Sequence, residues 1–553
     1  MPPTEATLTT EFLASTGLPG HDFDIEEKPS EKPAVILSRL DFGLAFIGLA
    51  LAVFIYSLDL TIVSVAIEVL SNEFNALDKI NWIGTGFFLS ATAFIPIFGQ
   101  MADVFGRKAT FLFAIFIFEL GSLLCGASQS IDMLIISRVI AGVGGAGVFT
   151  LTMVIIADLT VPRERGAYLG IIGAVYGVAS VLGPIIGGAM IDRVGWRWIF
   201  YINLPIGAVT ALSTVFFLKF PSTSFREIRA NFHKLDIIGS LLVIAFVVFC
   251  LVPLQGGGVD FAWNSAAVIV LFILSAILLA LFLLWEASFA VNPILPFSLL
   301  KNVHASATYI TVFFSGASFY VHTFYIPLWF QVVMGSSATN AGIHTIPFVL
   351  GIVVSSVGSG TVATATGHFF PFLPLGAVLT AIGAGLLTTM KEDATLGQQI
   401  GYMLLSGLGI GGAFQMLMVS AQVSVSPELL AASVSTNNFV QNLGVSMGVA
   451  IGGAIFNSRL PGAVADSLRT YNTNLEFLGG QPADVIFKDP TVIHNPSFVQ
   501  DGSVLQAALV HGYLESLSVL FYLPVGFACA WFATCMFVKK SKIESGVEMQ
   551  MAA

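Results

Sequence analysis

The sequence predicts an all-helical membrane protein that crosses the bilayer many times. Hydrophobic residues make up 56% and charged residues 10% of the 553 residues, whereas a soluble domain carries about 25% charged residues. Apolar runs of about 18 to 25 residues recur along the chain, and each is long enough to cross a hydrocarbon core of about 30 Å. These runs are too long and too uniformly apolar for barrel strands, so we expect helices.

Polar segments divide the apolar sequence into about fourteen predicted membrane spans. The ranges are 43–67, 81–101, 110–127, 132–157, 167–190, 198–218, 236–253, 265–287, 306–331, 343–364, 370–388, 398–422, 432–456 and 512–538. An even number of spans places both termini on the same side of the membrane. With the termini inside, the inner segments hold fifteen Lys and Arg and the outer segments seven. This excess predicts cytoplasmic termini.

The charge pattern and the spans divide the chain into two six-helix halves separated by an extra helix pair. The first residues are acidic and too polar to form a core, and no apolar segment typical of a cleavable signal peptide follows Met1. The expected parts are a disordered acidic cytoplasmic tail at 1–42, a first half at 43–218, a basic cytoplasmic linker with the extra pair at 219–300, a second half at 301–538 with an outer loop at 458–511, and a cytoplasmic tail at 539–553.

Glycine motifs of the first half recur in the second half at nearly the same separation. The matched segments are Gly142–Ala146 with Gly409–Ala413, Gly99 with Gly360, and Gly106 with Gly367. The charges are not repeated, because Leu405 stands where the first half has Arg138. Such a repeat predicts a binding site between the halves, near the middle of the bilayer.

Candidate proton-coupling residues are ionisable side chains inside predicted spans, where an ionised group costs about 2.5 to 3.5 kcal/mol to insert. They are Asp59 in the first span, Glu119 in the third and Arg138 in the fourth. One interpretation is proton coupling, in which Asp59 binds and releases a proton, Glu119 is a second protonatable group, and Arg138 pairs with Asp59 or Glu119. The alternative is structural, with fixed hydrogen bonds or ion pairs that hold helices together. Glu286 ends the eighth span, so we expect a boundary residue.

A short charged turn separates the second and third predicted spans. Its candidate gating residues are Gly99, Asp103, Gly106, Arg107 and Lys108. The glycines permit a tight reversal, and the two cations favour the cytoplasmic side. We expect this turn to latch the arrangement that is closed on the inside.

The fifth span carries a second candidate gating motif, Gly183, Pro184, Gly187 and Gly188. Glycines four residues apart precede it, and the thirteenth span has a ladder of its own, at Gly444, Gly448 and Gly452. Such spacing lets helices approach closely, and proline removes one backbone donor. Matched ladders favour an interface that slides or rocks, and static packing is the alternative.

Polar side chains of the ninth, twelfth and thirteenth spans are candidate walls of a substrate cavity. They are His322, Gln415, Asn438, Gln441 and Asn442. Hydrogen bonds between helices are the alternative explanation. The 48 phenylalanines include enough aromatic surface to line a cavity for a bulky apolar ligand, although most face lipid or other helices.

The sequence contains no motif that indicates a cofactor, a metal or an enzyme. All four cysteines lie in apolar runs, so disulfides and metal clusters are not expected. His-Glu-x-x-His does not occur, which disfavours a membrane-embedded enzyme. The expected partners are the bilayer, a small hydrophobic substrate and protons. Nucleic acid is not expected, since there is no basic patch, and we expect a monomer.

Several segments together resemble the fourteen-span drug:proton antiporter branch of the major facilitator superfamily, in particular its fungal multidrug and toxin efflux members. The similar segments are Leu58–Val63, the Gly99–Lys108 turn, Arg138 with Gly142, Gly183–Gly188, Trp196–Pro205 and Asn292–Pro296. The departures are Ser64, Glu68 and Ala141, where the family motifs usually have Asn, Pro and Gln. The resemblance extends over residues 43–538.

The resemblance implies a proton-coupled exporter of small, largely apolar organic compounds such as drugs or fungal toxins, with no cofactor beyond the proton gradient. It assigns proton coupling to Asp59 and proton transfer to Arg138, and it associates Gly183–Gly188 with export. It also favours the plasma membrane, with a vacuolar or vesicle membrane as the alternative. A same-fold importer of a nutrient or metal chelate and a transporter-like sensor are the rival functions.

Overall fold

The structure is a computed structural model that describes residues 37–74, 79, 81–220, 226, 231–257, 261–473, 493–494, 499, 502–540 and 542. Residues 1–36 and 543–553 of the expected tails lie outside the described residues, as does most of the expected outer loop between 474 and 501. Within the described residues there is no β-strand, and one isolated bridge joins Gly257 to Phe261.

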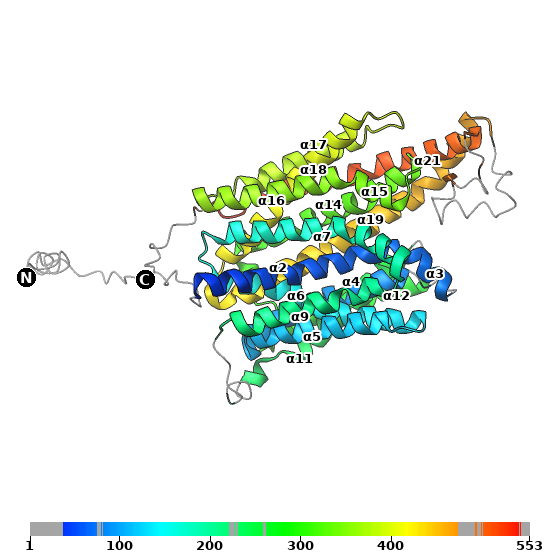
Figure 1. Cartoon of the computed structure of the whole chain (residues 1–553). Coiled ribbons are helices and arrows are strands. Elements are labelled where there is room, and N and C mark those ends of the chain that lie inside the picture. The colour runs from blue at the N-terminus through cyan, green and yellow to red at the C-terminus, as the bar shows by residue number, and fades with distance from the viewer. Residues whose placement is uncertain are drawn as a thin grey trace, which may run out of the picture. The chain divides into compact units, whose positions relative to one another are not determined.

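The described residues form helices that run alongside one another (Figure 1). They are α2 Arg39–Ile62, η1 Val63–Val65, α3 Ile67–Phe74, α4 Asn81–Phe105, α5 Arg107–Gly126, α6 Ile131–Leu159, α7 Arg165–Val194, α8 Trp198–Tyr201, α9 Asn203–Phe217, η3 Phe232–Lys234, α11 Ile237–Gly256, α12 Ala266–Ser288, α13 Phe297–Lys301, α14 Val303–Val332, α15 Ala338–His344, α16 Ile346–Thr366, α17 Phe372–Leu387, α18 Leu396–Val423, η4 Pro427–Leu429, α19 Leu430–Thr470, α21 Val504–Leu520 and α22 Tyr522–Cys535.

Twelve helical segments of the described chain are long and apolar enough to cross a membrane. The prediction of an all-helical polytopic protein is therefore confirmed. A helix occupies each of the fourteen predicted ranges, but α17 has only 16 residues, and α14 is not among the twelve. Ser130 and Ser265 are the N-cap residues of α6 and α12, and the side-chain oxygen of each accepts a hydrogen bond from a backbone amide in the first turn.

Two predicted boundaries are wrong. Helix α2 begins at Arg39, so residues 39–42 are helical instead of part of the tail. Helix α19 continues to Thr470, and α21 begins at Val504, so both ends of the range 458–511 are helical. The reason is that hydropathy marks where apolar sequence ends, whereas a helix can continue into more polar residues, and α19 continues even through Pro461.

The repeated glycine motifs occupy equivalent places in the fold. Helix α6 packs against α4 and α5, and α18 packs in the same way against α16 and α17. Gly106 and Gly367 turn the chain after α4 and α16 with φ angles of 88° and 76°, which residues with a Cβ rarely adopt. We refer to α2–α9 as the N-terminal group and to α14–α22 as the C-terminal group.

Two helix interfaces join the groups, α7 with α16 and α4 with α19. The carbonyl oxygen of Gly360 would lie 3.1 Å from a Cβ at Gly166, and the Ser435 side chain closes against Gly99. Gly99 and Gly360, which the sequence pairs as repeats, therefore serve the two equivalent interfaces. The extra helix α11 packs on α4, α12 and α19.

Hydrogen bonds reinforce this junction at the end that carries the charged turn. The Arg163 guanidinium donates to the carbonyl oxygens of Thr364 at 3.0 Å and Ala365 at 2.9 Å. The amide of Ala167 donates to the Thr364 hydroxyl at 3.1 Å. Since 163–167 belong to the N-terminal group and 364–365 end α16, the two groups are closed against each other at this end.

Candidate functional site: a central cavity beside a buried ion pair

A cavity lies between the two helix groups and takes its walls from both. Helices α2, α4, α6 and α7 form one side, and α14, α16, α18 and α19 form the other. Its empty space is about 830 Å³, counting the part that is open to solvent. A cavity between two related helix groups is a typical place for a small-molecule site, and it lies where the repeat predicts a binding site.

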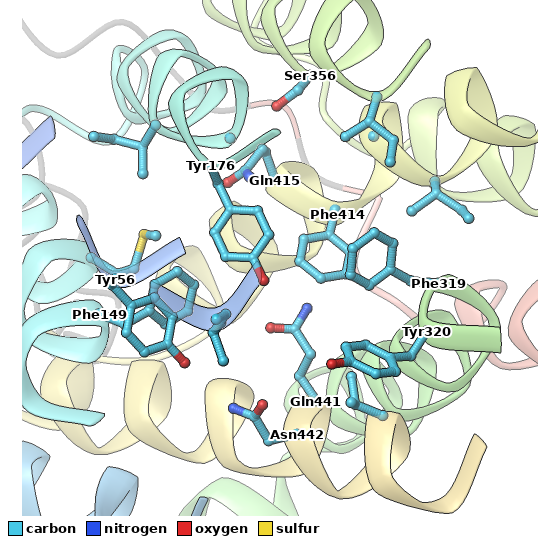
Figure 2. A pocket seen from close by; sticks show the side chains of 18 of the residues that line it. Tyr56, Phe149, Tyr176, Phe319, Tyr320, Ser356, Phe414, Gln415, Gln441 and Asn442 are labelled. Atoms are coloured by element: carbon cyan, nitrogen blue, oxygen red, sulfur yellow. The ribbon is translucent and has the colours of Figure 1, made fainter. Parts of the chain in front are cut away.

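The cavity wall is aromatic and carries no charged side chain. Its 19 lining residues include seven aromatic ones, Tyr56, Phe88, Phe149, Tyr176, Phe319, Tyr320 and Phe414. Figure 2 shows the hydroxyls of Tyr176 and Tyr320 and the amide of Gln441 pointing toward the same space. The wall can therefore stack on an apolar ring system and offer a few uncharged hydrogen-bonding groups to it.

Three of the five predicted cavity residues line this cavity, namely Gln415, Gln441 and Asn442. The other two are buried elsewhere. The His322 ring stacks on Phe348 with centroids 5.6 Å apart, and its Nδ1 lies 2.8 Å from the Ser318 carbonyl oxygen. Neither amide atom of Asn438 has a hydrogen-bond partner among the described residues. The aromatic residues of the wall were missed individually, because their sequence environment does not distinguish them from other aromatic residues in the spans.

A buried ion pair lies directly behind the cavity wall. The Arg138 guanidinium of α6 donates to Asp59 Oδ2 of α2 at 2.5 Å, and both residues are at most 1% exposed. Arg138 also donates to the Ile83 carbonyl oxygen at 3.3 Å and lies 4.3 Å from the Phe87 ring centroid. The pair is adjacent to the cavity, because Asp59 precedes Leu60 and Phe87 precedes Phe88, and both of these following residues line it.

Asn203 completes the hydrogen bonding of Asp59. Its side-chain amide donates to Asp59 Oδ1 at 3.0 Å and to the Ser122 hydroxyl at 3.1 Å. Asn203 begins α9, so the carboxylate joins α2, α6 and α9. The sequence contains Asn203 in its Trp196–Pro205 motif, but no spacing rule connects it with Asp59.

Glu119 does not pair with Arg138. Both carboxyl oxygens are buried and have no hydrogen-bond partner among the described residues. The carboxyl group of Glu119 occupies the space that a Cβ at Gly207 of α9 would need. Of the two partners that the sequence offers to Arg138, the structure therefore selects Asp59.

The charged turn forms a three-residue network within the N-terminal group. Arg107 donates to Asp103 Oδ1 at 2.7 Å and to Asp158 Oδ2 of α6 at 3.0 Å. Lys108 donates to the Val215 carbonyl oxygen of α9 at 2.7 Å. The turn thus ties α4, α5, α6 and α9 together, and Asp158 is a partner that the sequence motif does not reveal.

The glycine and proline motif of α7 lies against the helix that carries Asp59. A Cβ at Gly183 would collide with the Thr61 side chain, and one at Gly187 would lie 2.8 Å from Ile62. Gly188 has nothing within 4 Å of such a Cβ. The close approach of α7 to α2 therefore depends on Gly183 and Gly187, with Pro184 inside the helix.

The two glycine ladders serve different interfaces. Gly166, Gly170 and Gly173 of α7 face α16 in the C-terminal group, whereas Gly444 and Gly448 of α19 face α14 of their own group. Only the α7 ladder therefore lies at a junction between the groups. The α19 ladder therefore fits the alternative of static packing, because the sequence does not specify which face of a helix meets which neighbour.

The described residues contain no cluster of three His, Cys, Asp or Glu side chains that could hold a metal ion. Helices of membrane-spanning length and a cavity between two related helix groups define a membrane transporter. The chain belongs to the Major Facilitator Superfamily, whose sequence model matches residues 49–449. The family identifies the chain as a transporter and not an enzyme, as the sequence motifs predict.

Related proteins are fungal efflux pumps. The chain is 39% identical over 434 residues to "MFS-type efflux pump MFS1" of Trichophyton rubrum, covering 78% of this chain and 81% of the relative. It is 35% identical over 453 residues to "Efflux pump aflT" of Aspergillus parasiticus, with 81% and 87% covered. It is 34% identical over 533 residues to "Efflux pump dotC" of Dothistroma septosporum, with 94% and 89% covered. The predicted resemblance to fungal efflux transporters is thereby confirmed.

Solved structures share the fold at low sequence identity. The human organic anion transporter MFSD10 (TETRAN) aligns with a TM-score of 0.55 and 15% identity over 91% of this chain and 100% of that chain. The proton:xylose symporter XylE bound to 6-bromo-6-deoxy-D-glucose aligns with a TM-score of 0.55 and 13% identity, with 91% and 97% covered. At these identities the likeness establishes the fold alone.

Proposed function

We propose that this protein is a proton-coupled exporter of small, largely apolar organic compounds, such as drugs or fungal secondary metabolites. The observation that carries the proposal is the buried pair of Asp59 and Arg138 directly behind an uncharged aromatic cavity. The names of the fungal relatives, which describe efflux pumps, support the outward direction.

Proton coupling would act through the ion pair. A proton that binds Asp59 removes its negative charge, so the attraction to Arg138 is lost and α2 can shift against α6 and α9. Inward movement of one proton contributes about 2.3 kcal/mol per 100 mV of membrane potential. Glu119, buried beside α9 without a partner, would be a second protonatable group.

Alternating access would come from rocking of the two helix groups about the cavity. We propose fourteen crossings, including α14 and α17, with both termini cytoplasmic, which follows the excess of Lys and Arg on the inner segments. The network of Asp103, Arg107 and Asp158 would then lie at the inner face and stabilise the inward-closed arrangement. The plasma membrane is the proposed location, and a monomer the proposed functional unit.

The experiment measures accumulation of hydrophobic dyes and fungal toxins in a pump-deficient host, with and without a protonophore. Cells that express the protein should accumulate less compound, and either the protonophore or Asp59→Asn should restore accumulation. The matched control is Asp41→Asn in the same helix, which removes only the partly exposed pair with Lys219.

Correct localisation of each variant is checked first. Full export by the Asp59→Asn variant would reject Asp59 as the coupling group, and higher accumulation on expression would mean import in place of export. No change for any compound would leave transport of this class unsupported and favour a sensor.

A further inference from the structure

A second pair of carboxyl groups is buried outside the central site, on the extra helix pair. Asp236 begins α11 and Glu286 lies near the end of α12; they are 8% and 4% exposed. The expectation that Glu286 is a boundary residue in contact with headgroups is therefore wrong. Its side chain turns inward because the segment after α12 folds back over it, and the amide of Leu295 donates to Glu286 Oε2 at 3.0 Å.

Each carboxyl group has one satisfied oxygen and one without a donor. Asp236 Oδ1 accepts hydrogen bonds from the Gly239 amide and the Trp285 indole, both at 2.8 Å. Asp236 Oδ2 and Glu286 Oε1 have no partner among the described residues. Both free oxygens lie against Gly239, where a Cβ would be 2.7 Å from Glu286 Oε1 and nearer still to Asp236 Oδ2. Because both free oxygens approach the same point beside Gly239, they are close neighbours.

The surroundings supply no cation to this pair. Within the described chain, neither carboxyl group forms an ion pair. Charged side chains do occur on the neighbouring elements. Asp103 of α4 is bonded to Arg107. The others are exposed, and they are His233 and Lys234 before α11, Lys301 of α13, and Arg459, Asp466 and Arg469 of α19. Two ionised carboxylates side by side in a buried place repel strongly, and one proton between them removes the repulsion.

The pair also sits at a structural junction. Gln100 of α4 accepts a hydrogen bond from the Asp236 amide at 3.0 Å and donates one to the Asn292 carbonyl oxygen at 2.7 Å. It therefore connects the N-terminal group to the start of α11 and to the segment that leads into the C-terminal group. Gln100 is three residues before Asp103 of the charged turn.

We propose that Asp236 and Glu286 form a second proton-binding site, which holds one exchangeable proton between Asp236 Oδ2 and Glu286 Oε1. The proton comes from water and returns to it, and its loss leaves two adjacent negative charges that push α11 and α12 apart. The site makes the junction between the two helix groups dependent on pH. It is independent of Asp59, so it stands whether or not Asp59 couples transport.

Infrared difference spectroscopy of purified protein in lipid nanodiscs tests this site. The background is Asp59→Asn with Glu119→Gln, which removes the carboxyls of the central site. A carbonyl band of a protonated, buried carboxyl group should remain and should decline reversibly as the pH is raised. The band should be absent when either Glu286→Gln or Asp236→Asn is added, because an amide then donates to the remaining carboxylate. The matched control is Glu392→Gln, an exposed carboxyl in a loop, which should leave the band unchanged.

Two results would overturn the proposal. A band that persists in both added variants belongs to another group, and a band that does not respond to pH while the protein stays folded belongs to a fixed structural acid. If one added variant fails to fold, the other decides whether the band belongs to this pair, because each variant removes one of the two carboxyls.

Thermal unfolding gives a second readout. The folded pair holds a proton that the unfolded chain releases, so stability should fall as pH rises. Glu286→Gln should reduce this dependence, and an unchanged slope would contradict the assignment.

Discussion

The chemistry of individual residues is set by what surrounds each buried polar atom. Asp59 tolerates complete burial because Arg138 and Asn203 satisfy both of its oxygens, whereas the buried carboxyl oxygens of Glu119 have no donor among the residues that the structure describes. The positions of the surrounding hydrogen-bond donors alone thus distinguish the paired carboxylate of Asp59 from the unpaired carboxyl group of Glu119. Asn203 contributes no charge, yet it fixes the position of the carboxylate.

Asn203→Ala should weaken proton-driven export more than protein stability. The variant leaves Asp59 Oδ1 without a donor, and a hydrogen bond to a charged group contributes about 1.5 to 3 kcal/mol. We expect export to fall about tenfold or more and its pH dependence to shift, measured as dye efflux from cells at several external pH values.

Ser122→Ala is the control for this prediction, because it removes the other acceptor of Asn203 and leaves the bond to Asp59 intact. Equal losses of export in the two variants would mean that Asn203 acts through packing and not through Asp59.

At this scale the sequence predicts which residues matter better than it predicts their partners. Asp59 and Arg138 are detectable because ionised groups inside a membrane span are costly. The rotation of each helix about its axis decides the partners. It decides that Arg138 pairs with Asp59 and not with Glu119, that Asp158 binds Arg107 of the charged turn, and that Glu286 turns inward. An almost uniformly apolar span has too little amphipathic pattern to fix that rotation.

At the scale of helices, the interface between α7 and α16 is a contact of backbone with backbone. At Gly166 and Gly360, glycines on both sides let the two helices meet without intervening side chains. Close contacts of this kind are disrupted by a single added side chain, since packed interfaces do not deform continuously.

Gly360→Val should prevent the closed arrangement at this interface. The new side chain would collide with the Gly166 backbone, and overpacking costs about 1 to 3 kcal/mol. This cost corresponds to a shift of about tenfold or more in the balance between closed and open states. Labelling of a cysteine introduced at Ala167 should become faster in the Gly360→Val protein.

Gly358→Val in the same helix is the matched control, because nothing lies within 4 Å of a Cβ at Gly358. If the Gly358 and Gly360 variants label at the same rate, the α7–α16 contact does not control access.

Hydropathy predicts the existence of the helices well, because each apolar run must form its backbone hydrogen bonds within itself when it lies in lipid. It does not predict that α19 extends to Thr470, since a helix continues into water wherever its sequence allows. It also leaves open which neighbour each glycine ladder meets, as the contrast between α7 and α19 shows.

For the whole molecule, the proposed function makes the shared cavity the place where compounds are selected. Its lining comes from eight helices in two groups and contains no ionised side chain. Desolvation of a charged ligand would therefore be uncompensated there. The repeat in the sequence predicts where such a cavity lies, but its aromatic lining could be read only from the structure.

Neutral aromatic compounds should be exported at least about tenfold better than cationic analogues of the same size, because the cavity offers no counter-charge. The measurement compares efflux of matched dye pairs that differ in one permanent charge. Tyr176→Phe and Tyr320→Phe, which remove hydroxyls from the cavity, should alter export of dyes with hydrogen-bonding groups and spare purely hydrocarbon ones. Preferred export of the cationic dyes would contradict this reading of the wall.

The ion pair of Asp59 and Arg138 belongs entirely to the N-terminal group, while most of the cavity lining belongs to the C-terminal group. The proposed function thus places proton coupling in one copy of the repeated motif and most of the substrate contacts in the other. Under selection by a new toxin, substitutions in the second copy would then change the range of exported compounds while the coupling pair stays intact. Each intermediate along such a path would remain a working exporter.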